Sequence, residues 1–348
     1  MALKILTMLA GASVGGAETF FVSLTLALAR AGLGVRPVLK PNPARQQTFS
    51  RAGLSYATAP FRSVLDFSTA SVLRHTVKDF APDIVLAFAG RAASFAPKGR
   101  HTVIGRLGGY YNLRNFRSCD YLVCNAPDLV RYVREGGWPA EKVFLIPNFP
   151  FVPDAPALDR ALFHTPQDAP LAVALGRLHP NKGLDVLIRA AGEIPELFVW
   201  IAGEGPERQN LEKLVRDLGL GRRVKFLGWR DDRAALYKAA DLCVYPSREE
   251  PFGNVVVEAW SCGIPIVTTA STGPAWLTRK DEDAIVTPVD DTAAFAAGIR
   301  RVIACKALAA SLVSAGRRRI EQDFSEDAIV RRYSELFEKA RLIEKASR

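Results

Sequence analysis

The fold is most clearly indicated by the stretch LCVYPSREEPFGNVVVEAWSCGIPIVT, residues 242–268. Its first four residues, Leu242–Tyr245, predict a short buried strand, and Pro265–Thr268 predict a second one. Between them, Asn254–Cys262 has the apolar periodicity of a helix that Gly253 and Asn254 open. A strand, a helix and a second strand in this order form a βαβ unit, which is typical of a parallel sheet covered by helices.

The same alternation extends in both directions along the 348 residues. It predicts further strands at Leu3–Leu9, Val35–Leu39, Ile84–Phe88, Thr102–Gly105, Tyr121–Cys124, Val143–Ile146, Leu171–Leu175, Phe198–Ala202 and Val224–Leu227. It predicts further helices at Glu18–Arg30, Ala126–Glu135, Leu184–Ala191, Glu207–Leu218 and Asp232–Ala239. Because single cores stop growing above ~250 residues, this length suits two domains. We therefore expect an α/β protein of two Rossmann-like domains whose parallel sheets face each other across a cleft.

The domain boundaries follow from a proline-rich interval after Asn148. Pro150, Pro153, Pro156 and Pro166 interrupt any periodicity there, as in a linker. We expect a first domain over residues 1–158, a second over 166–325 and a final helix over 326–348.

The composition favours an anionic partner. The chain has 46 Lys and Arg against 36 Asp and Glu, a formal charge of +10. Such an excess suits nucleic acid, an acidic membrane surface or a phosphorylated ligand. The basic residues are spread out and no zinc-finger or RNA-binding signature occurs, so we expect no nucleic acid among the partners.

Cysteine and histidine usage argues against disulfides and metal sites. The five cysteines form no CxxC pair, which predicts reduced thiols in the core. The four histidines have no metal-ligand spacing, so we expect no metal site. No apolar run approaches the ~18 residues of a membrane span, and the N-terminus differs from a cleaved signal. We expect a cytoplasmic protein.

Two carboxylates, Glu250 and Glu258, mark the strongest candidate site. Glu250 lies in the loop after a predicted strand, at the sheet edge where open α/β folds bind ligands. Free N–H groups at the helix start beside Gly253 can accept an anion, and the glutamates suit the hydroxyls of a sugar. Asn254, Glu258 and Ser261 fall on one helical face, which predicts a polar stripe. The alternative is a capped surface helix with a solvated glutamate.

Two cations follow the first strand of the second domain, in the stretch Gly176-Arg177-Leu178-His179-Pro180-Asn181-Lys182-Gly183. Arg177 and Lys182 can hold a diphosphate there and offset the charge of a departing phosphate. This stretch lacks the GxxxxGK[ST] pattern of a Walker A loop. The alternative is a glycine-punctuated turn with surface charges.

Glycines mark two more strand-to-helix turns. Gly11, Gly15 and Gly16 open the first long helix, where backbone can approach a phosphate closely. Their spacing differs from GxGxxG, which removes the main support for an NAD-dependent oxidoreductase. Gly203, in Gly203-Glu204-Gly205-Pro206, starts a tight turn near the second domain's candidate site, although such sequences are often turns alone.

Taken together, these residues resemble the GT-B glycosyltransferases of family 4, whose hallmark is two glutamates separated by seven residues, as in Glu250 and Glu258. The resemblance spans nearly the whole chain in order and spacing. It includes Gly15-Gly16-Ala17-Glu18, Ile146-Pro147-Asn148, Gly176-Arg177-Leu178 with Lys182-Gly183, Gly203-Glu204-Gly205-Pro206, Phe226-Leu227-Gly228, Ala240-Asp241, and Glu250-Pro251-Phe252-Gly253 through Ile264-Pro265.

The resemblance implies a role for each candidate residue. Arg177 and Lys182 would bind the donor diphosphate, and Glu258 the ribose. Glu250 would bind the transferred sugar with the backbone of Phe252, Gly253 and Asn254. Gly16 would approach the phosphates from the first domain, and Gly203 would pass close to the donor. The catalytic group would be Glu250, Arg177 and Lys182, acting without a metal or cofactor and with retention at the sugar.

Two departures from the family pattern concern the sugar site. The family commonly places a His after a first-domain strand, where this chain has Thr102–Tyr111 with no His at the strand end. Arg106 or Tyr110 is the expected replacement and acceptor contact, and the alternative is that this contact to a sugar hydroxyl is absent. The usual Glu after Thr272-Gly273 is missing, and Trp276 stands nearby.

The stretch Arg106–Arg114 is similar to bacterial lipopolysaccharide-core glycosyltransferases. The resemblance implies transfer of a hexose from a nucleotide-sugar donor to a glycan or glycolipid acceptor, in the assembly of the lipopolysaccharide core or another cell-envelope glycan. The positive charge of the chain suits an anionic lipid-linked acceptor at the inner face of the cytoplasmic membrane. The family's final helix would cross back onto the first domain. The alternatives are a nucleotide-sugar epimerase of the same fold and a non-catalytic nucleotide-sugar-binding protein.

Overall fold

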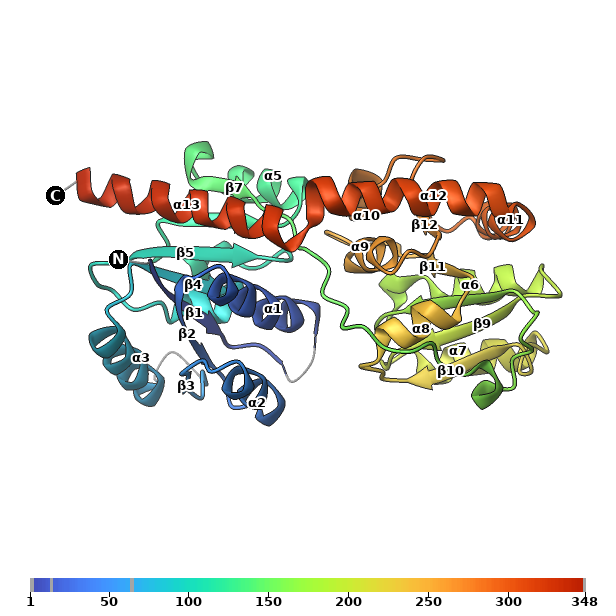
Figure 1. Cartoon of the computed structure of the whole chain (residues 1–348), viewed down its shortest axis with the longest axis horizontal. Coiled ribbons are helices and arrows are strands. Elements are labelled where there is room, and N and C mark those ends of the chain that lie inside the picture. The colour runs from blue at the N-terminus through green and yellow to red at the C-terminus, as the bar shows by residue number, and fades with distance from the viewer. Residues whose placement is uncertain (1–2, 13–14, 63–65, 347–348) are drawn as a thin grey trace. The chain divides into compact units, whose positions relative to one another are not determined.

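The computed structural model describes residues 3–12, 15–62 and 66–346. These residues divide into two compact units (Figure 1). The first unit combines the described residues of Met1–Asn148 with those of Glu326–Arg348. The second unit is Phe149–Ser325.

The first unit is built on a parallel sheet with, in its described residues, seven strands in the order β3-β2-β1-β4-β5-β6-β7. The strands are β1 Lys4–Leu9, β2 Gly34–Leu39, β3 Ala57–Thr58, β4 Ile84–Phe88, β5 Thr102–Leu107, β6 Tyr121–Cys124 and β7 Val143–Leu145. The helices are α1 Gly16–Arg30, α2 Pro43–Arg51, α3 Phe67–Phe80, α4 Ala89–Ser94, η1 Leu113–Phe116, α5 Pro127–Glu135, η2 Ala140–Lys142 and α13 Glu326–Ala346. All five residues of β4 are buried, as a central strand covered on both faces requires.

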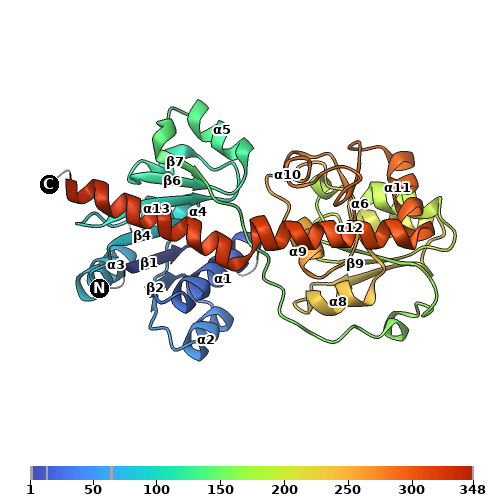
Figure 2. The same ribbon diagram turned by 45° about the horizontal axis from the view of Figure 1, so that its top comes forward.

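The last helix, α13, belongs to the first unit (Figure 1, Figure 2). Its first residue, Glu326, accepts hydrogen bonds from the Arg30 guanidinium of α1 at 2.6 and 2.7 Å. Farther along, Tyr333 is fully buried, and the ammonium of Lys339 lies 5.0 Å from the centre of the Phe144 ring. The expected return of the final helix to the first domain is confirmed.

The second unit repeats the architecture, with six parallel strands in the order β10-β9-β8-β11-β12-β13 among its described residues. The strands are β8 Leu171–Leu175, β9 Phe198–Ala202, β10 Val224–Gly228, β11 Leu242–Tyr245, β12 Ile266–Thr269 and β13 Ile285–Thr287. The helices are η3 Arg160–Phe163, η4 Pro180–Lys182, α6 Leu184–Gly192, α7 Arg208–Asp217, α8 Arg233–Ala239, α9 Asn254–Ser261, α10 Thr272–Leu277, α11 Thr292–Ala304, α12 Lys306–Arg319 and the π-helical turn η5 Ile320–Phe324.

Two apolar layers hold this second sheet. Helices α6, α7 and α11 cover one face, and α8 and α9 cover the other. Trp200 and Trp260 are fully buried in the second layer, and their indole N–H groups donate to Thr165 Oγ1 at 3.0 Å and to the Asp283 carbonyl at 2.9 Å. Burying each ring contributes ~4–6 kcal/mol, from ~150–250 Å² at ~25 cal/mol per Å².

The residues between 149 and 158, which the sequence assigns to the first domain, instead pack with the second unit. The backbone N–H of Leu158 donates to the Ala235 carbonyl at 3.0 Å, and Lys238 pairs with Asp154. The proline-rich segment therefore lies along the second unit, held there by α8.

The cysteines follow the core prediction in part. Cys119, Cys124 and Cys243 are buried, and Cys262 is half-buried. Cys305 is exposed, which corrects the prediction for that residue. Its sulfur accepts the Leu308 N–H at 3.4 Å and so caps the start of α12.

None of the helices in the described part of the chain has the length and apolar character needed to cross a membrane.

Candidate active site

The candidate residues of the second unit gather where its sheet changes winding direction. Strands β8 and β11 are neighbours, and the sheet grows outward from them on both sides. The loops that leave the carboxyl ends of two such strands diverge, and ligands of open α/β sheets bind there. The loop after β8 carries Arg177 and Lys182, and the loop after β11 carries Glu250. We call them the cation loop, residues 176–183, and the glutamate loop, residues 246–253.

Backbone contacts join the cation loop to the glutamate loop. The Asn181 carbonyl accepts hydrogen bonds from the N–H groups of Arg248 at 2.8 Å and Glu249 at 3.2 Å. Gly183 has a φ of 60°, and a Cβ there would overlap the Pro246 carbonyl. Only glycine therefore lets the two chain segments approach this closely.

Lys182 and Glu250 meet as an ion pair. The Tyr245 hydroxyl donates to the same Glu250 oxygen at 2.5 Å and lies 3.4 Å from the Lys182 ammonium nitrogen. The Lys182 side chain is 20% exposed and that of Glu250 is 16% exposed. Burial and the adjacent Glu250 raise the pKa of Tyr245 well above its ordinary value, so the phenol remains a hydrogen-bond donor. The site thus holds a cation, a carboxylate and a fixed hydroxyl within reach of solvent.

Glu258 is buried, with 6% of the residue exposed. The predicted polar stripe on α9 is therefore wrong at this residue, because α8 packs over it. One carboxylate oxygen pairs with Arg233 of α8, and the other accepts from the Tyr237 hydroxyl at 3.2 Å. Burial raises the pKa of Glu258, and the Arg233 guanidinium opposes that change.

At the start of α9, the groups suited to bind a ligand belong to the backbone rather than to side chains. Phe252 is 2% exposed and packs against Trp276 and Phe324, with ring centroids 6.1 and 6.5 Å away. Gly253 precedes the helix with a φ of 99°, and Asn254 is half-buried. In the family pattern, a glutamate near this position contacts the donor. In this chain Trp276 stands nearby and packs against Phe252 of the glutamate loop.

Arg177 and Gly203 occupy the neighbouring turns. Arg177 is exposed and has no ion pair within the residues that the structure describes. A Cβ at Gly203 would overlap the Gly176 carbonyl, so the loops after β8 and β9 are in contact. Arg177 is therefore available to an anion at this edge of the sheet.

Gly16 is the first residue of α1 in the other unit. Part of the preceding glycine loop, residues 13–14, lies outside the described residues. The Glu18 carboxylate accepts the Ala12 N–H at 2.8 Å, and Arg45 donates to the Ala12 carbonyl at 2.7 Å. A carboxylate therefore lies against the loop that the sequence assigns to phosphate.

Arg106 does not offer the predicted acceptor contact, because it is 2% exposed. Its guanidinium lies 4.3 Å from the centre of the Phe20 ring, donates to the Tyr333 hydroxyl at 3.2 Å and bonds to Asn148. These contacts join β5 to α13 in the core of the first unit. Tyr110 is 52% exposed and bonds to Asp128, and it remains a candidate.

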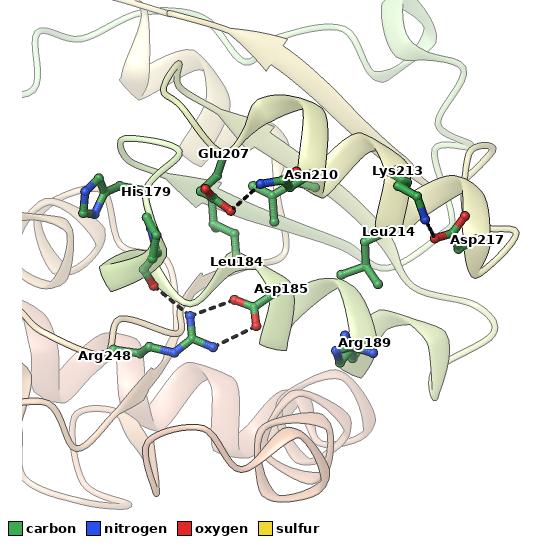
Figure 3. A pocket seen from close by; sticks show the side chains of 12 residues that line it. His179, Leu184, Asp185, Arg189, Glu207, Asn210, Lys213, Leu214, Asp217 and Arg248 are labelled. Carbon is green, nitrogen blue, oxygen red and sulfur yellow. Dashed lines mark hydrogen bonds and ion pairs between the residues drawn. The ribbon is translucent and has the colours of Figure 1, made fainter.

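A pocket of about 410 Å³ lies between α6 and α7 of the second unit (Figure 3). Arg248 and Asp185 form one wall, and Lys213 pairs with Asp217 in another. The residues that line this pocket do not include Lys182 or Glu250. Residues of both loops line it, namely His179 and Pro180 of the cation loop and Arg248 of the glutamate loop, but the Lys182–Glu250 pair does not.

The sequence does not predict four residues that bond to the site: Tyr245, Arg233, Tyr237 and Arg248. Tyr245 ends the β11 strand, which could have pointed to it as a polar group at the sheet edge. The other three act through contacts between elements that are distant in sequence, and no local pattern indicates them.

No set of three His, Cys, Asp or Glu side chains that could hold a metal ion is found in residues 3–12, 15–62 and 66–346.

This chain is similar in sequence to known proteins. The family model described as glycosyl transferases group 1 matches residues 159–319, which contain both loops. The lipopolysaccharide core biosynthesis glycosyltransferase LpsE of Rhizobium meliloti (strain 1021) is 36% identical over 92% of this chain and 95% of the relative. LpsD of the same organism is 35% identical over 93% of this chain and 95% of the relative.

A solved structure shares the fold over the full length. HepE of Anabaena, determined in complex with UDP and glucose, has a TM-score of 0.81 at 22% identity, covering 97% of this chain and 100% of that one. The predicted α/β class with two Rossmann-like domains, the GT-B fold, is thereby confirmed. The chain belongs to the group 1 glycosyl transferases and is a glycosyltransferase.

Proposed function

We propose that this glycosyltransferase moves a hexose from a nucleoside diphosphate sugar to a saccharide or glycolipid acceptor in lipopolysaccharide-core assembly. The observation that carries the proposal is the meeting of Lys182 and Glu250 where the loops after β8 and β11 diverge. A cation for the phosphates and a carboxylate for sugar hydroxyls are the two groups that such a donor requires at its reacting end.

The donor would lie along the edge of the second sheet. Arg177 and Lys182 would bind the diphosphate, and Glu250 with the backbone of residues 252–254 would bind the sugar. For Glu258 to accept hydrogen bonds from the ribose hydroxyls, its buried carboxylate would have to exchange the Arg233 or Tyr237 contact for them. HepE, which shares the fold, was solved with UDP and glucose, and this supports a nucleotide-sugar donor here.

The proposed reaction retains the configuration of the sugar and uses no metal or cofactor. The bond between the anomeric carbon and the β-phosphate oxygen breaks, and the acceptor hydroxyl oxygen bonds to that carbon from the same face. The departing phosphate takes the acceptor proton. At ~4 Å and an effective dielectric of ~20, each fixed cation contributes about 4 kcal/mol before desolvation, enough to stabilise the leaving diphosphate.

The acceptor would bind the first unit. The names of LpsE and LpsD support a lipopolysaccharide-core acceptor. Tyr110 is the exposed side chain nearest in sequence to the expected sugar contact. The charge of +10 suits an anionic acceptor at the inner face of the cytoplasmic membrane.

The test is thermal unfolding with UDP, GDP and ADP and their sugars, with and without EDTA. A nucleotide at 100 times its Kd adds ~2.7 kcal/mol to the free energy of unfolding. We expect one nucleotide family to stabilise the wild type in EDTA, and Arg177→Ala to remove most of that effect. Arg216→Ala is the matched control, because Arg216 is an exposed arginine on α7.

A folded wild type that none of these ligands stabilises would refute the proposal. Loss of stabilisation in EDTA would refute its metal-independent part alone. Conversion of the donor without any acceptor, to an isomeric nucleotide sugar, would instead identify an epimerase.

A further inference from the structure

We propose that Arg248 is a positioning residue, which holds the cation loop and the glutamate loop in the register that brings Lys182 to Glu250. The inference rests on the proposed function, because it assigns a purpose to the alignment of these two loops. Arg248 itself faces the pocket of Figure 3, which neither Lys182 nor Glu250 lines. Its influence on the reaction would therefore be exerted through the backbone.

The Arg248 guanidinium binds groups on three elements. It donates to both carboxylate oxygens of Asp185, at 2.8 Å each, in the first turn of α6 (Figure 3). It donates to the Pro180 carbonyl of the cation loop at 2.7 Å. It also donates to Asp290, after β13, at 2.5 Å. A planar guanidinium can satisfy this fork of acceptors, and a lysine ammonium cannot match it.

The backbone of Arg248 adds to these contacts, and we call the Arg248 side-chain and backbone contacts together the clamp. The Arg248 N–H donates to the Asn181 carbonyl at 2.8 Å, so one residue binds two successive carbonyls of the cation loop. The Ser247 hydroxyl donates to the Asn181 carbonyl as well, at 3.2 Å. Lys182 follows Asn181 directly, and Glu250 lies two residues after Arg248. Both ends of the Lys182–Glu250 pair are thus fixed within two residues of the clamp.

The two carboxylates contribute differently. The Asp185 side chain is 39% exposed and binds Arg248 through two parallel hydrogen bonds, whereas Asp290 is 55% exposed and binds through one. Exposed single contacts contribute little, because water screens them and competes for the same groups. The Asp185 contact, which connects α6 to the glutamate loop, should therefore dominate.

Loss of the clamp should impair turnover more than donor binding. A displacement of ~1 Å at reacting groups can cost about 100-fold in rate. We expect Arg248→Gln to lower the kcat of donor hydrolysis about 30- to 100-fold and to change the donor Kd less than fivefold. Arg248→Lys should lose about tenfold, Asp185→Asn about tenfold, and Asp290→Asn less than twofold.

The matched control is Arg160→Gln. Arg160 also binds one carboxylate, Asp241, and several backbone carbonyls of the second unit, but beside the amino ends of β8 and β11, whereas the two loops leave the carboxyl ends of these strands. If Arg248→Gln acted only by lowering the stability of the second unit, the two Gln variants would have the same kcat at a temperature well below unfolding. The proposal requires Arg160→Gln to keep kcat within twofold of the wild type.

The experiment measures hydrolysis of UDP-glucose, GDP-mannose and ADP-glucose, together with amide hydrogen exchange of residues 177–183 and 247–254. Faster exchange in both segments and a kcat loss in Arg248→Gln support the clamp. Unchanged exchange, or a kcat within twofold of Arg160→Gln, overturns it. A wild type that hydrolyses none of the three donors counts against the proposed function. In that case, the amide hydrogen exchange of the two segments decides whether Arg248 holds the loops. If Arg248→Gln does not fold, Asp185→Asn gives the same comparison.

Discussion

Replacing Arg233 with alanine is the most direct test of the buried carboxylate in the second unit. The change leaves the Glu258 carboxylate, whose side chain is 8% exposed, with a hydrogen bond from the Tyr237 hydroxyl. Removing one partner of a buried ion pair costs ~3–5 kcal/mol. Because the Arg233 side chain is 25% exposed, solvent screens part of that interaction. We expect Arg233→Ala to lower the free energy of unfolding of the second unit by about 2–4 kcal/mol.

The assay is urea unfolding followed by tryptophan fluorescence. Four of the five tryptophans, Trp200, Trp229, Trp260 and Trp276, lie in the second unit, so the signal reports mainly on that unit. The double variant Arg233→Ala with Glu258→Gln should recover part of the loss, because it removes the uncompensated charge. A loss below ~0.5 kcal/mol in the single variant, or no recovery in the double variant, would show that the pair does not hold Glu258 as described.

Three further predictions concern the same unit. Tyr245→Phe removes the hydroxyl that donates to Glu250 at 2.5 Å. Because a hydrogen bond to a charged group contributes ~1.5–3 kcal/mol, we expect donor turnover to fall about 10- to 100-fold. Unchanged turnover would exclude a role for the phenol. Gly183→Ala should lower the free energy of unfolding by at least ~2 kcal/mol, because a Cβ there is strained at a left-handed φ and overlaps the Pro246 carbonyl. Gly219→Ala has a φ of 67° with open space around it and should cost only ~1–2 kcal/mol. Equal losses in urea unfolding would contradict the close approach of Gly183 to Pro246. Burial raises the pKa of Glu258, so the stability that this carboxyl contributes is fully present below about pH 4.3, the ordinary pKa of an unfolded Glu, and is lost as pH rises through the folded pKa. The free energy of unfolding of Glu258→Gln, relative to that of the wild type, should therefore increase between pH 4 and pH 7. A difference that does not change with pH would argue against the raised pKa.

The sequence predicted the sheets well because their strands are short, apolar and separated by clear helical periods. The bounds of β4, β6, β8, β9 and β11 agree with the prediction residue for residue. Both loops of the candidate site could be placed as well, because each directly follows one of these strands. Periodicity did not reveal β3, with two residues, or β13, with three, since runs that short carry no pattern.

The side-chain environment of the site was much less predictable. Glu258 lies on a helix whose spacing suggests a polar stripe, yet α8 covers it and supplies Arg233. Arg106 looks like an exposed cation after a strand, yet α13, more than two hundred residues later in the chain, buries it against Phe20. In both residues the decisive contact comes from a distant element, and local periodicity contains no information about such a contact.

The place of α13 in the first unit has a consequence for biosynthesis. Ribosomal synthesis at ~5–20 residues per second takes roughly 10–35 s to add residues 149–325 after the first 148 have been made. During that interval the nascent first unit lacks Tyr333, which is buried beside Arg106 in the completed structure. The unit whose synthesis starts first is therefore completed last, after every residue of the second unit has been made.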